Sequence, residues 1–594
     1  MLSAPSLGKR VFLMRYEAQI QEAFSRLGFS PRDNQVDAIN TICVEFLDNK
    51  IKNLVLSAPT GTGKSIIAVV AAEVVHKIKH PDNNSGASFL LTATNVLSAQ
   101  YHDTFVDTEA PEDNVFHVIK GAANYECRAL STPEEPQNAE SCSIVMFQKQ
   151  AMDTIIQTYC NECEYNWSRK QKNKSRHLIT NYAYYFLDRM YSTHPMEKRS
   201  VCVFDEAHLM NDLFVEHNAI YFSEKRLAGF IEEVSEHLSL GNTDVFKNLK
   251  LIKDHLVTGR ITDQNYMTYL TTLHNTYKQI SDAAAREADR NNRNHKKYHA
   301  LAKLGKKYFN LGCKIDDLVI FGYPHIFEHK AKDIKKFQTE HEVTVKPVFV
   351  GDMFEALDNA DHNLLMSATI SDVFVNRTMT LPQTTKFIKL PPQFPPENKK
   401  IVFFKTQTLN YTTMKDPATI KKLCASIYQI VDFHTRKGER GIILAPSFVI
   451  VQSVAETLRV MDGNYKIFEQ ERGQKLAVLL EEFKAYNKGP AVLLTPSGFE
   501  GIDLPNELSR FQILCKTPFG SLGDKRIAHI LNVYNDIYSL TACMRLVQGA
   551  GRSVRSAEDW AITYCLDAAA QRLWVSKTNA WQDEFLATFS SQLE

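Results

Sequence analysis

Short apolar runs alternate with longer stretches of helical periodicity along this chain. The run 53–57 is followed by a glycine-containing turn and by the apolar stretch 66–75, which predicts a buried strand, a turn and a buried helix. Similar strand-like runs lie at residues 88–94, 201–204 and 364–370. Buried strands that alternate with helices are typical of an α/β fold with a parallel sheet.

The same pattern returns in the last third of the chain and predicts a second α/β domain. Residues 212–350 differ, because they are charged and helix-periodic with few β-branched runs, so we expect a helical insertion there. Five prolines between residues 381 and 400 predict a linker between the two α/β patterns. The strand-like runs of the second pattern are 441–444, 491–495, 511–515 and 560–566.

The length and charge of the chain limit the classes of protein to which it can belong. A chain of 594 residues is too long for one hydrophobic core, and about two to four domains are expected. The 69 Lys and Arg residues balance 68 Asp and Glu residues, so any basic surface for a polyanion must be local. The N-terminus lacks a signal-peptide core and no apolar run approaches membrane-spanning length, so we expect a cytoplasmic location and no membrane partner.

The turn after the first strand, APTGTGKS at residues 58–65, has the composition of a phosphate-binding loop. Its glycines let backbone N–H groups point at phosphate oxygens, Lys64 reaches the β- and γ-phosphates, and Ser65 ligates Mg²⁺. A chance Gly- and Thr-rich turn is the alternative, but the strand–turn–helix context favours nucleotide binding. The predicted nucleotide-binding residues are Ala58, Pro59, Thr60, Gly61, Thr62, Gly63, Lys64 and Ser65.

Two further segments have the chemistry that a nucleotide site needs. The run 201–204 ends in Asp205 and Glu206, which would hold Mg²⁺ through water and polarise the attacking water, and His208 could sense the γ-phosphate. Upstream of the loop, the amide of Gln35 suits an adenine base, although a surface glutamine is an equally good interpretation.

Four cysteines form the most unusual segment. Cys127, Cys142, Cys160 and Cys163 have the spacing C-x14-C-x17-C-x2-C, and four thiolates can hold a 4Fe–4S cluster or a Zn²⁺ ion. Scattered buried thiols are the alternative, which the polar, proline-containing stretch 131–141 argues against. Basic and aromatic residues follow within 159–176; they suit single-stranded nucleic acid, although a charge run is more often a solvated face.

Polar residues also end the second strand-like run. Thr94 and Asn95 follow the run and suit contact with a nucleic-acid backbone, with ordinary helix capping as the alternative.

These motifs in this order resemble the superfamily 2 helicases, and among them the iron–sulfur XPD/DinG family. The resemblance spans about residues 29–567. Its segments are KGAANYEC at 120–127, Asn181-Tyr182, DEAH at 205–208, FPPEN at 394–398, EGID at 500–503, KTPF at 516–519 and QGAGRSVR at 548–555. The cysteine spacing is the chain's own, so zinc remains open on coordination grounds.

The resemblance implies an α/β chain with two RecA-like parallel-sheet motor domains, the first interrupted by an Fe–S domain and a helical arch. It places the first motor domain at 1–118, 177–213 and 351–382, and the second at 383–594. The Fe–S domain would be 119–176 and the arch 214–350. ATP, Mg²⁺ and a 4Fe–4S cluster would be the cofactors, and single-stranded and forked DNA the partners of a motor expected to be monomeric.

The resemblance also assigns residue roles. Lys64, Asp205, Glu206, Gln548, Arg552 and Arg555 would be catalytic. Arg32, Gln35 and Asp503 would join the phosphate loop around the nucleotide. Cys127, Cys142, Cys160 and Cys163 would hold the cluster. Thr94, Asn95, Ser447 and Ser497 would lie near the DNA backbone.

The expected activity is 5′→3′ translocation on single-stranded DNA with duplex unwinding. A translocase that remodels nucleoprotein complexes without unwinding is one alternative, and a DNA-binding scaffold with a dispensable motor is another. RNA or a DNA:RNA hybrid as substrate also stays open.

Overall fold

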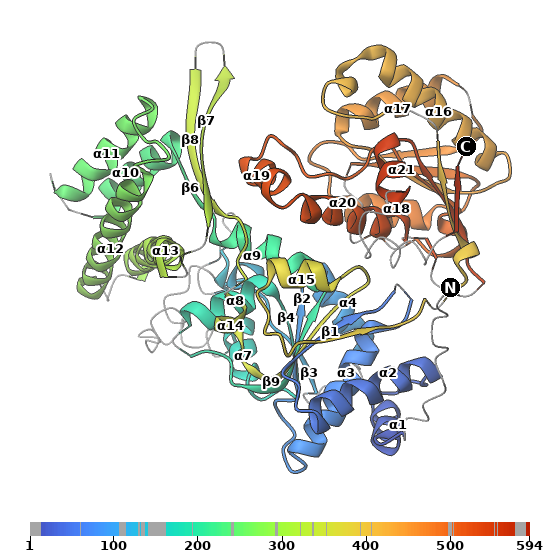
Figure 1. Ribbon diagram of the computed structural model, residues 1–594. Helices are drawn as coiled ribbons and strands as arrows, with labels where there is room; N and C mark the ends of the chain where they lie inside the picture. Colours follow the sequence, from blue (N-terminus) through green and yellow to red (C-terminus); the bar gives the residue numbers. More distant parts are fainter. Residues whose placement is uncertain are drawn as a thin grey trace.

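The computed structural model places most of the chain in two lobes and an insertion beside them (Figure 1). The described residues are 14–59, 61–105, 115–128, 131, 137–139, 162–192, 194–238, 243–291, 295–320, 322, 324–335, 338–351, 353–392, 394–404, 407–461, 463–496, 502, 504–551, 553–554, 556, 558–575 and 590–593.

The first lobe is built on a seven-stranded parallel sheet. Its strand order is β10 (Lys386–Lys389), β1 (Asn53–Ser57), β9 (Ala360–Ser367), β5 (Arg199–Asp205), β2 (Ser88–Thr92), β4 (His177–Asn181) and β3 (Phe116–Val118). Successive residues of a strand face opposite sides, so Val55 joins one apolar core while Leu54 and Leu56 join the other. Burial on both faces explains why these strands are continuous apolar runs.

Helices cover both faces of this sheet (Figure 1). They are α1 (Glu17–Arg26), α2 (Asp33–Cys43), α3 (Lys64–Lys79), α4 (Asn95–Phe105), α7 (Glu164–Gln171), α8 (Tyr182–Tyr191), α9 (Met210–Asn218), α14 (Met353–Leu357) and α15 (Asp372–Thr378). Because β1, β9, β5, β2 and β4 are parallel neighbours, their carboxyl ends meet at one edge of the sheet. The phosphate loop, Asp205 and Asn181 therefore lie along that edge.

The second lobe has its own seven-stranded parallel sheet. The strand order is β13 (Lys466–Glu469), β14 (Ala491–Thr495), β12 (Gly441–Leu444), β15 (Phe511–Leu514), β16 (Ala561–Cys565), β11 (Lys399–Phe403) and β17 (Ser590–Leu593). Its helices are α16 (Pro417–Thr435), α17 (Phe448–Val460), α18 (Leu476–Ala485), α19 (Lys525–Val533), α20 (Asn535–Ala550) and α21 (Ala568–Val575). Two RecA-like parallel sheets thus form the α/β architecture that the sequence predicts.

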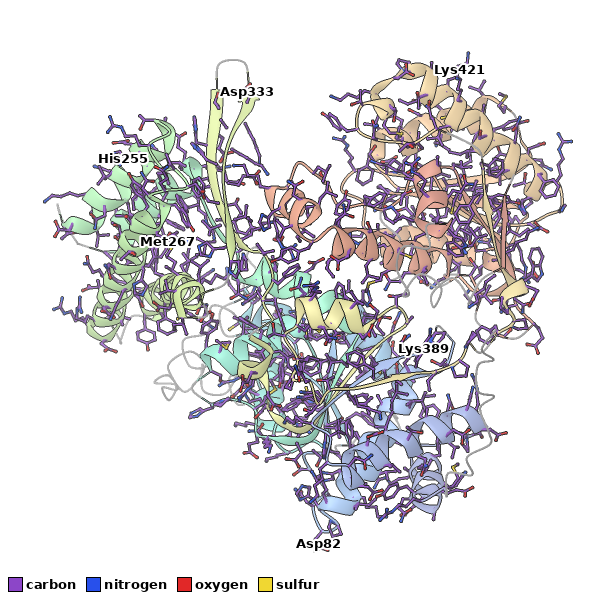
Figure 2. The ribbon with its side chains drawn as sticks, in the orientation of Figure 1. Asp82, His255, Met267, Asp333, Lys389 and Lys421 are labelled. Atoms are coloured by element: carbon purple, nitrogen blue, oxygen red, sulfur yellow. The ribbon has the colours of Figure 1, made fainter. Side chains whose placement is uncertain are left out.

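The insertion combines helices with a small sheet. Helices α10 (Glu224–His237), α11 (Asp244–Val257), α12 (Tyr266–Arg290) and α13 (His295–Ile320) share an apolar core. Strands β6 (Ile220–Ser223), β8 (Gln338–Pro347) and β7 (His325–Lys335) form an antiparallel sheet, and Asp333 lies near the far end of its hairpin (Figure 2). The prediction of a purely helical insertion is therefore incomplete, because the charged outer face of the hairpin hides its strand pattern.

The predicted proline-rich linker also differs from the structure. Residues 386–389 form β10, which pairs in parallel with β1 of the first sheet. The predicted second motor domain, 383–594, includes these residues, whereas their pairing places them in the sheet of the first lobe. Lys389 accordingly lies where the chain leaves the first lobe, and the crossing to the second lobe follows it (Figure 2).

In the described part of the chain, the helices are too short or too polar to traverse a lipid bilayer.

Buried histidines make the stability of the fold depend on pH. Burial lowers the pKa of His76, His117 and His362 to about 4, and it holds the pKa of His177 well below its usual value. These side chains stay neutral in the fold but take up a proton below about pH 6.5 when the chain unfolds. The contribution of these histidines to the free energy of unfolding is therefore fully present above pH 6.5. It falls as the pH is lowered below 6.5, by about 1.4 kcal/mol per pH unit for each histidine.

We expect the thermal unfolding midpoint to fall as the pH is lowered from 7.5 to 5, as measured by circular dichroism. His76→Gln should weaken this dependence, because its ring lies buried between Ser200 and the Asn83 carbonyl. The exposed His80, at the end of the same helix, provides the control variant His80→Gln. An unfolding midpoint that does not change over this pH range contradicts the account.

Candidate ATP and nucleic-acid site

The phosphate loop lies between the carboxyl end of β1 and the first residue of α3. The Ala58 N–H donates to the Ser367 carbonyl oxygen at 2.9 Å, which ties the loop to the end of β9. Gly61 and Gly63 have φ values of 87° and 75°, a conformation that residues with side chains rarely adopt. Lys64 and Ser65 begin α3, so the partial positive charge of the helix N-terminus points into the loop.

Gln35 of α2 and Arg32, the N-cap residue of this helix, form hydrogen bonds with the phosphate loop. The Gln35 amide donates to the Thr62 carbonyl at 3.0 Å and accepts from the Arg32 N–H at 3.2 Å. The Arg32 guanidinium donates to the Gly61 carbonyl at 3.3 Å. Gln35 is 3% exposed, so in this structure its amide supports the loop. Adenine recognition by Gln35 remains a prediction, and the amide has a further donor and lone pair for it.

Phe394 is a site residue that the sequence analysis missed. A Cβ atom on Gly61 would lie 2.4 Å from the Phe394 ring, so the ring sits directly against the loop. The same ring packs with Val554 and Ala561 of the second lobe. The motif FPPEN at 394–398 marks this segment but assigns the ring no role, because the contact depends on how the two lobes meet.

Asp205 occupies the end of β5 close to the loop. Burial and the neighbouring Glu206 raise the pKa of Asp205 to about 6, while Lys64 opposes the rise. Its carboxylate accepts from the Tyr101 hydroxyl at 3.1 Å and from the Glu206 N–H at 3.0 Å. A divalent cation bound beside this carboxylate would favour its ionised form. The geometry therefore fits the predicted Mg²⁺ role of Asp205 with Ser65.

A chain of hydrogen bonds starts at α20 of the second lobe and ends at Glu206 of the first. The Gln548 amide donates to His208 Nε2 at 2.6 Å, so the ring proton of His208 is on Nδ1. His208 Nδ1 donates to the Ser367 hydroxyl at 2.8 Å. Ser367 in turn donates to the Glu206 carboxylate at 3.3 Å. These hydrogen bonds connect the second lobe with the carboxylate that is predicted to polarise water.

Gln548 also donates to the Thr369 hydroxyl at 3.1 Å, so one buried amide contacts two motifs of the first lobe. Ser367 is the last residue of β9 and Thr369 follows the strand, within the predicted strand-like run LLMSATI, whose pattern assigns these residues no role. Their function became visible only when β9 was placed between β1 and β5.

Gln548→Ala is expected to lower the ATP turnover rate about 5- to 150-fold, because two hydrogen bonds between the lobes are lost. A steady-state phosphate-release assay measures the rate. Thr541→Ala on the same helix provides the control, since its hydroxyl donates only to the Ile537 carbonyl of α20 among the described contacts. Equal turnover in both variants would show that the lobes communicate without Gln548.

Ion pairs reinforce the contact between the lobes. The Arg526 guanidinium donates to Asp212 at 3.1 Å and to the Val348 carbonyl at 3.0 Å. Arg545 lies 3.8 Å from the second oxygen of Asp212. Lys346 of β8 reaches Asp524, the N-cap residue of α19, at 3.4 Å. The base of the insertion and the second lobe are thus linked through α19, which Figure 1 shows extending toward β7.

Polar side chains line the carboxyl edge of β2 and β4. Thr94 and Asn95 are exposed at the start of α4, as expected for the predicted backbone contacts. Asn95 accepts a hydrogen bond from the Asn181 amide at 2.6 Å and donates to Asn124 at 3.4 Å. Ser447, the N-cap residue of α17, is exposed at the corresponding edge of the second sheet.

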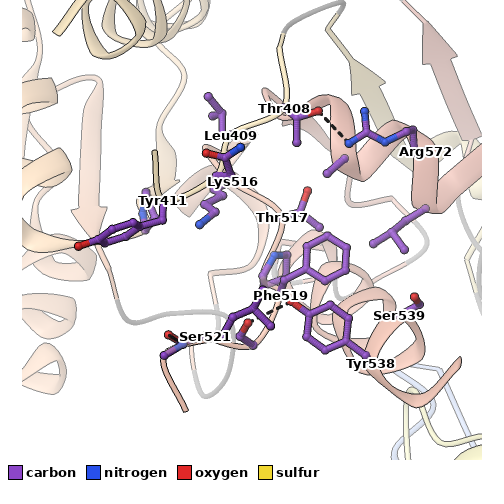
Figure 3. Close-up of a pocket in the computed structure, with 18 of the residues that line it drawn as sticks. Thr408, Leu409, Tyr411, Lys516, Thr517, Phe519, Ser521, Tyr538, Ser539 and Arg572 are labelled. Atoms are coloured by element: carbon purple, nitrogen blue, oxygen red, sulfur yellow. Dashed lines mark hydrogen bonds between the residues drawn. The ribbon is translucent and has the colours of Figure 1, made fainter. Parts of the chain in front are cut away.

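A cavity of about 1350 Å³ opens at the carboxyl edge of the second sheet (Figure 3). The rings of Phe519 and Tyr538 stack in it, with centroids 5.1 Å apart and planes at 16°. Lys516 and Arg572 supply positive charge, and the Arg572 guanidinium donates to the Thr408 hydroxyl at 2.8 Å. Stacked rings beside cations can hold the bases and phosphates of a single strand.

Two of the four candidate cluster ligands are described. Cys127 is buried, and the half-buried Cys163 packs against the small core of Tyr125, Ala139 and Tyr165. Within the described residues, no group of three or more His, Cys, Asp or Glu side chains has metal-binding geometry. Cys142 and Cys160 lie outside the described residues, as do the predicted site residues Thr60, Ser497, Asp503, Arg552 and Arg555.

Family models match both parts of this site. A model described as the type III restriction enzyme res subunit matches residues 28–231, and one described as the helicase C-terminal domain matches residues 430–588. No curated protein sequence matches the chain.

Solved structures match nearly the whole chain. The alignment with a structure titled "XPD_Helicase" covers 95% of this chain and 100% of the chain in that structure, with 14% identity and a TM-score of 0.59. The alignment with the structure of S. tokodaii Xpd4 covers 95% of this chain and 100% of the chain in that structure, with 13% identity and a TM-score of 0.52. The chain therefore has the fold of these XPD structures, and its two matched segments support a helicase motor.

The phosphate loop, Phe394 and Gln548 lie where the two lobes meet. The hydrogen bond between Gln548 and His208 joins the lobes at this place.

Proposed function

We propose that the protein is an ATP-dependent DNA helicase that translocates 5′→3′ on single-stranded DNA and unwinds duplex. The hydrogen-bond chain from Gln548 to Glu206 is the observation that carries this proposal. Because the chain joins a residue of the second lobe to the carboxylate beside the attacking water, hydrolysis and lobe movement depend on each other.

Each catalytic side chain has a defined task. Lys64 binds the β- and γ-phosphates, and Glu206 orients the water and takes its proton. Ser65 and Asp205 would hold Mg²⁺, which supplies positive charge to the phosphates. Arg552 and Arg555, which follow Gln548 in the same motif, would bring charge from the second lobe to the γ-phosphate.

The proposed path of the DNA strand runs over the carboxyl edges of both sheets. Thr94 and Asn95 would contact its backbone on the first lobe, and Ser447 and Ser497 on the second. The cavity beside Ser447 supports this path, because Phe519 and Tyr538 offer ring faces and Lys516 offers charge for phosphate.

A 4Fe–4S cluster held by Cys127, Cys142, Cys160 and Cys163 would staple the segment beside the first lobe. The packing of Cys163 against the core that contains Tyr125 supports a shared site with Cys127. A rigid stapled segment could act as the wedge that splits the duplex. Iron per chain in anaerobically purified protein tests the cluster; bound zinc instead would contradict it.

Two variants test the DNA path. Phe519→Ala is expected to raise the Kd for a single-stranded DNA oligonucleotide roughly 5- to 150-fold, because a stacked base is worth about 1–3 kcal/mol. Lys421→Ala provides the control, since this exposed residue of α16 (Figure 2) is not one of the described residues that line the cavity. Fluorescence anisotropy measures the Kd, and an unchanged Kd for Phe519→Ala contradicts the path.

An ATP hydrolysis assay with DNA or RNA added separates a DNA substrate from an RNA substrate. Stimulation of ATP hydrolysis by single-stranded DNA, and not by RNA of the same sequence, supports the proposed substrate. Equal or greater stimulation by RNA would contradict it.

A further inference from the structure

Two tyrosine hydroxyls converge on Asp205 from different helices. Tyr101 of α4 donates to the Asp205 carboxylate at 3.1 Å, and Tyr182 of α8 donates to its carbonyl oxygen at 2.7 Å. One side chain of α4 thus contacts the carboxylate that is predicted to hold Mg²⁺. Both tyrosines are buried, at 4% and 1% exposure.

Each of these helices begins at an asparagine on the surface. Asn95 is the first residue of α4, and Asn181 is the N-cap residue of α8, where its side chain accepts from the Tyr184 N–H at 2.8 Å. The Asn181 amide donates to Asn95 at 2.6 Å. The two helix starts are therefore joined to each other at the edge proposed to bind the DNA backbone.

Few residues separate each asparagine from the tyrosine that contacts Asp205. Tyr101 is six residues after Asn95 in one helix, a rise of about 9 Å. Tyr182 directly follows Asn181. A phosphate that competes for the Asn95 or Asn181 amides would shift the first turn of a helix, and the helix would carry that shift to the tyrosine hydroxyl.

We propose that Tyr101 and Tyr182 are positioning residues that couple single-stranded DNA at Asn95 and Asn181 to the geometry of Asp205, which is predicted to hold Mg²⁺. The inference rests on the proposed function, because it requires that DNA binds at this edge. Tyr101 orients the carboxylate of Asp205, and Tyr182 fixes its main chain.

Tyr101 and Tyr182 differ from another buried tyrosine of α8. Tyr185 of α8 is fully buried and donates to the Leu357 carbonyl at 2.8 Å, away from Asp205. Tyr185→Phe removes a buried hydroxyl of the same kind without changing the contacts of Asp205. It is therefore a matched control for the stability effects of losing such a hydroxyl.

A binding cycle on the full chain tests the coupling without using activity. The Kd of a single-stranded DNA oligonucleotide is measured by anisotropy with and without Mg²⁺ and a non-hydrolysable ATP analogue. The Kd of the labelled analogue is measured with and without DNA, and the two ratios must agree because coupling is reciprocal. For the unaltered protein we expect a coupling factor of about 5–150.

Tyr101→Phe is expected to bring the coupling factor close to 1, with the Kd for DNA alone unchanged. Tyr185→Phe should keep the factor of the unaltered protein. Tyr182→Phe is the second variant, and it should lower the factor as well if Tyr101→Phe does not fold.

The outcomes separate the inference from the proposed function. A protein that does not bind single-stranded DNA overturns the proposed function, and the inference with it. DNA binding with full coupling retained in a folded tyrosine variant overturns the inference alone. An equal loss of coupling in Tyr185→Phe also overturns it, because the loss would then follow from any missing buried hydroxyl.

Discussion

Glu206→Gln is expected to bind ATP normally and to hydrolyse it about 10²–10⁴ times more slowly than the unaltered protein. The amide keeps the shape of the side chain and can still accept from Ser367, but it cannot take a proton from the attacking water. Glu206 is held in a left-handed conformation with φ of 51°, and its side chain is 28% exposed, so the carboxylate stays accessible to water.

Single-turnover phosphate release measures the hydrolysis rate of Glu206→Gln, and binding of a fluorescent ATP analogue measures affinity. Glu232→Gln, an exposed position on α10 of the insertion, provides the control and should hydrolyse ATP at the normal rate. A Glu206→Gln rate within tenfold of normal would show that another group activates the water.

Lys64→Ala is expected to lower ATP turnover by about 10²–10³-fold, the usual cost of removing one preorganised charge from a phosphate site. In contrast to Glu206→Gln, it should also weaken nucleotide binding, because Lys64 contacts the phosphates in the ground state. Lys77→Ala on the same helix is the control, since Lys77 is exposed and pairs with Glu22. Normal nucleotide affinity in Lys64→Ala would contradict the assigned role of the loop.

Local patterns sufficed to locate the elements that carry the motifs. The apolar runs around residues 53–57 and 201–204 became β1 and β5, because strands buried on both faces are apolar throughout. The glycines of the phosphate loop mark a backbone that few other residues adopt. Such signals lie within a few residues of the feature they predict.

Contacts between distant segments could not be predicted in this way. Tyr101 and Phe394 reach the nucleotide site only because the sheet brings α4 beside β5 and the lobes close on each other. The Gln35 amide serves the loop itself, which spacing alone did not reveal. Strand β10 was missed because its four residues, largely exposed, lack the apolar run of the other strands.

Strand displacement tests the central claim most directly. A duplex with a 5′ single-stranded tail and one with a 3′ tail are incubated with ATP and Mg²⁺, and release of the labelled strand is followed on a gel. A 5′→3′ helicase should release the labelled strand from the 5′-tailed duplex only, and Lys64→Ala should release no strand from either duplex. ATP-driven movement along single strands without release from either duplex, or release from the 3′-tailed duplex alone, would contradict it.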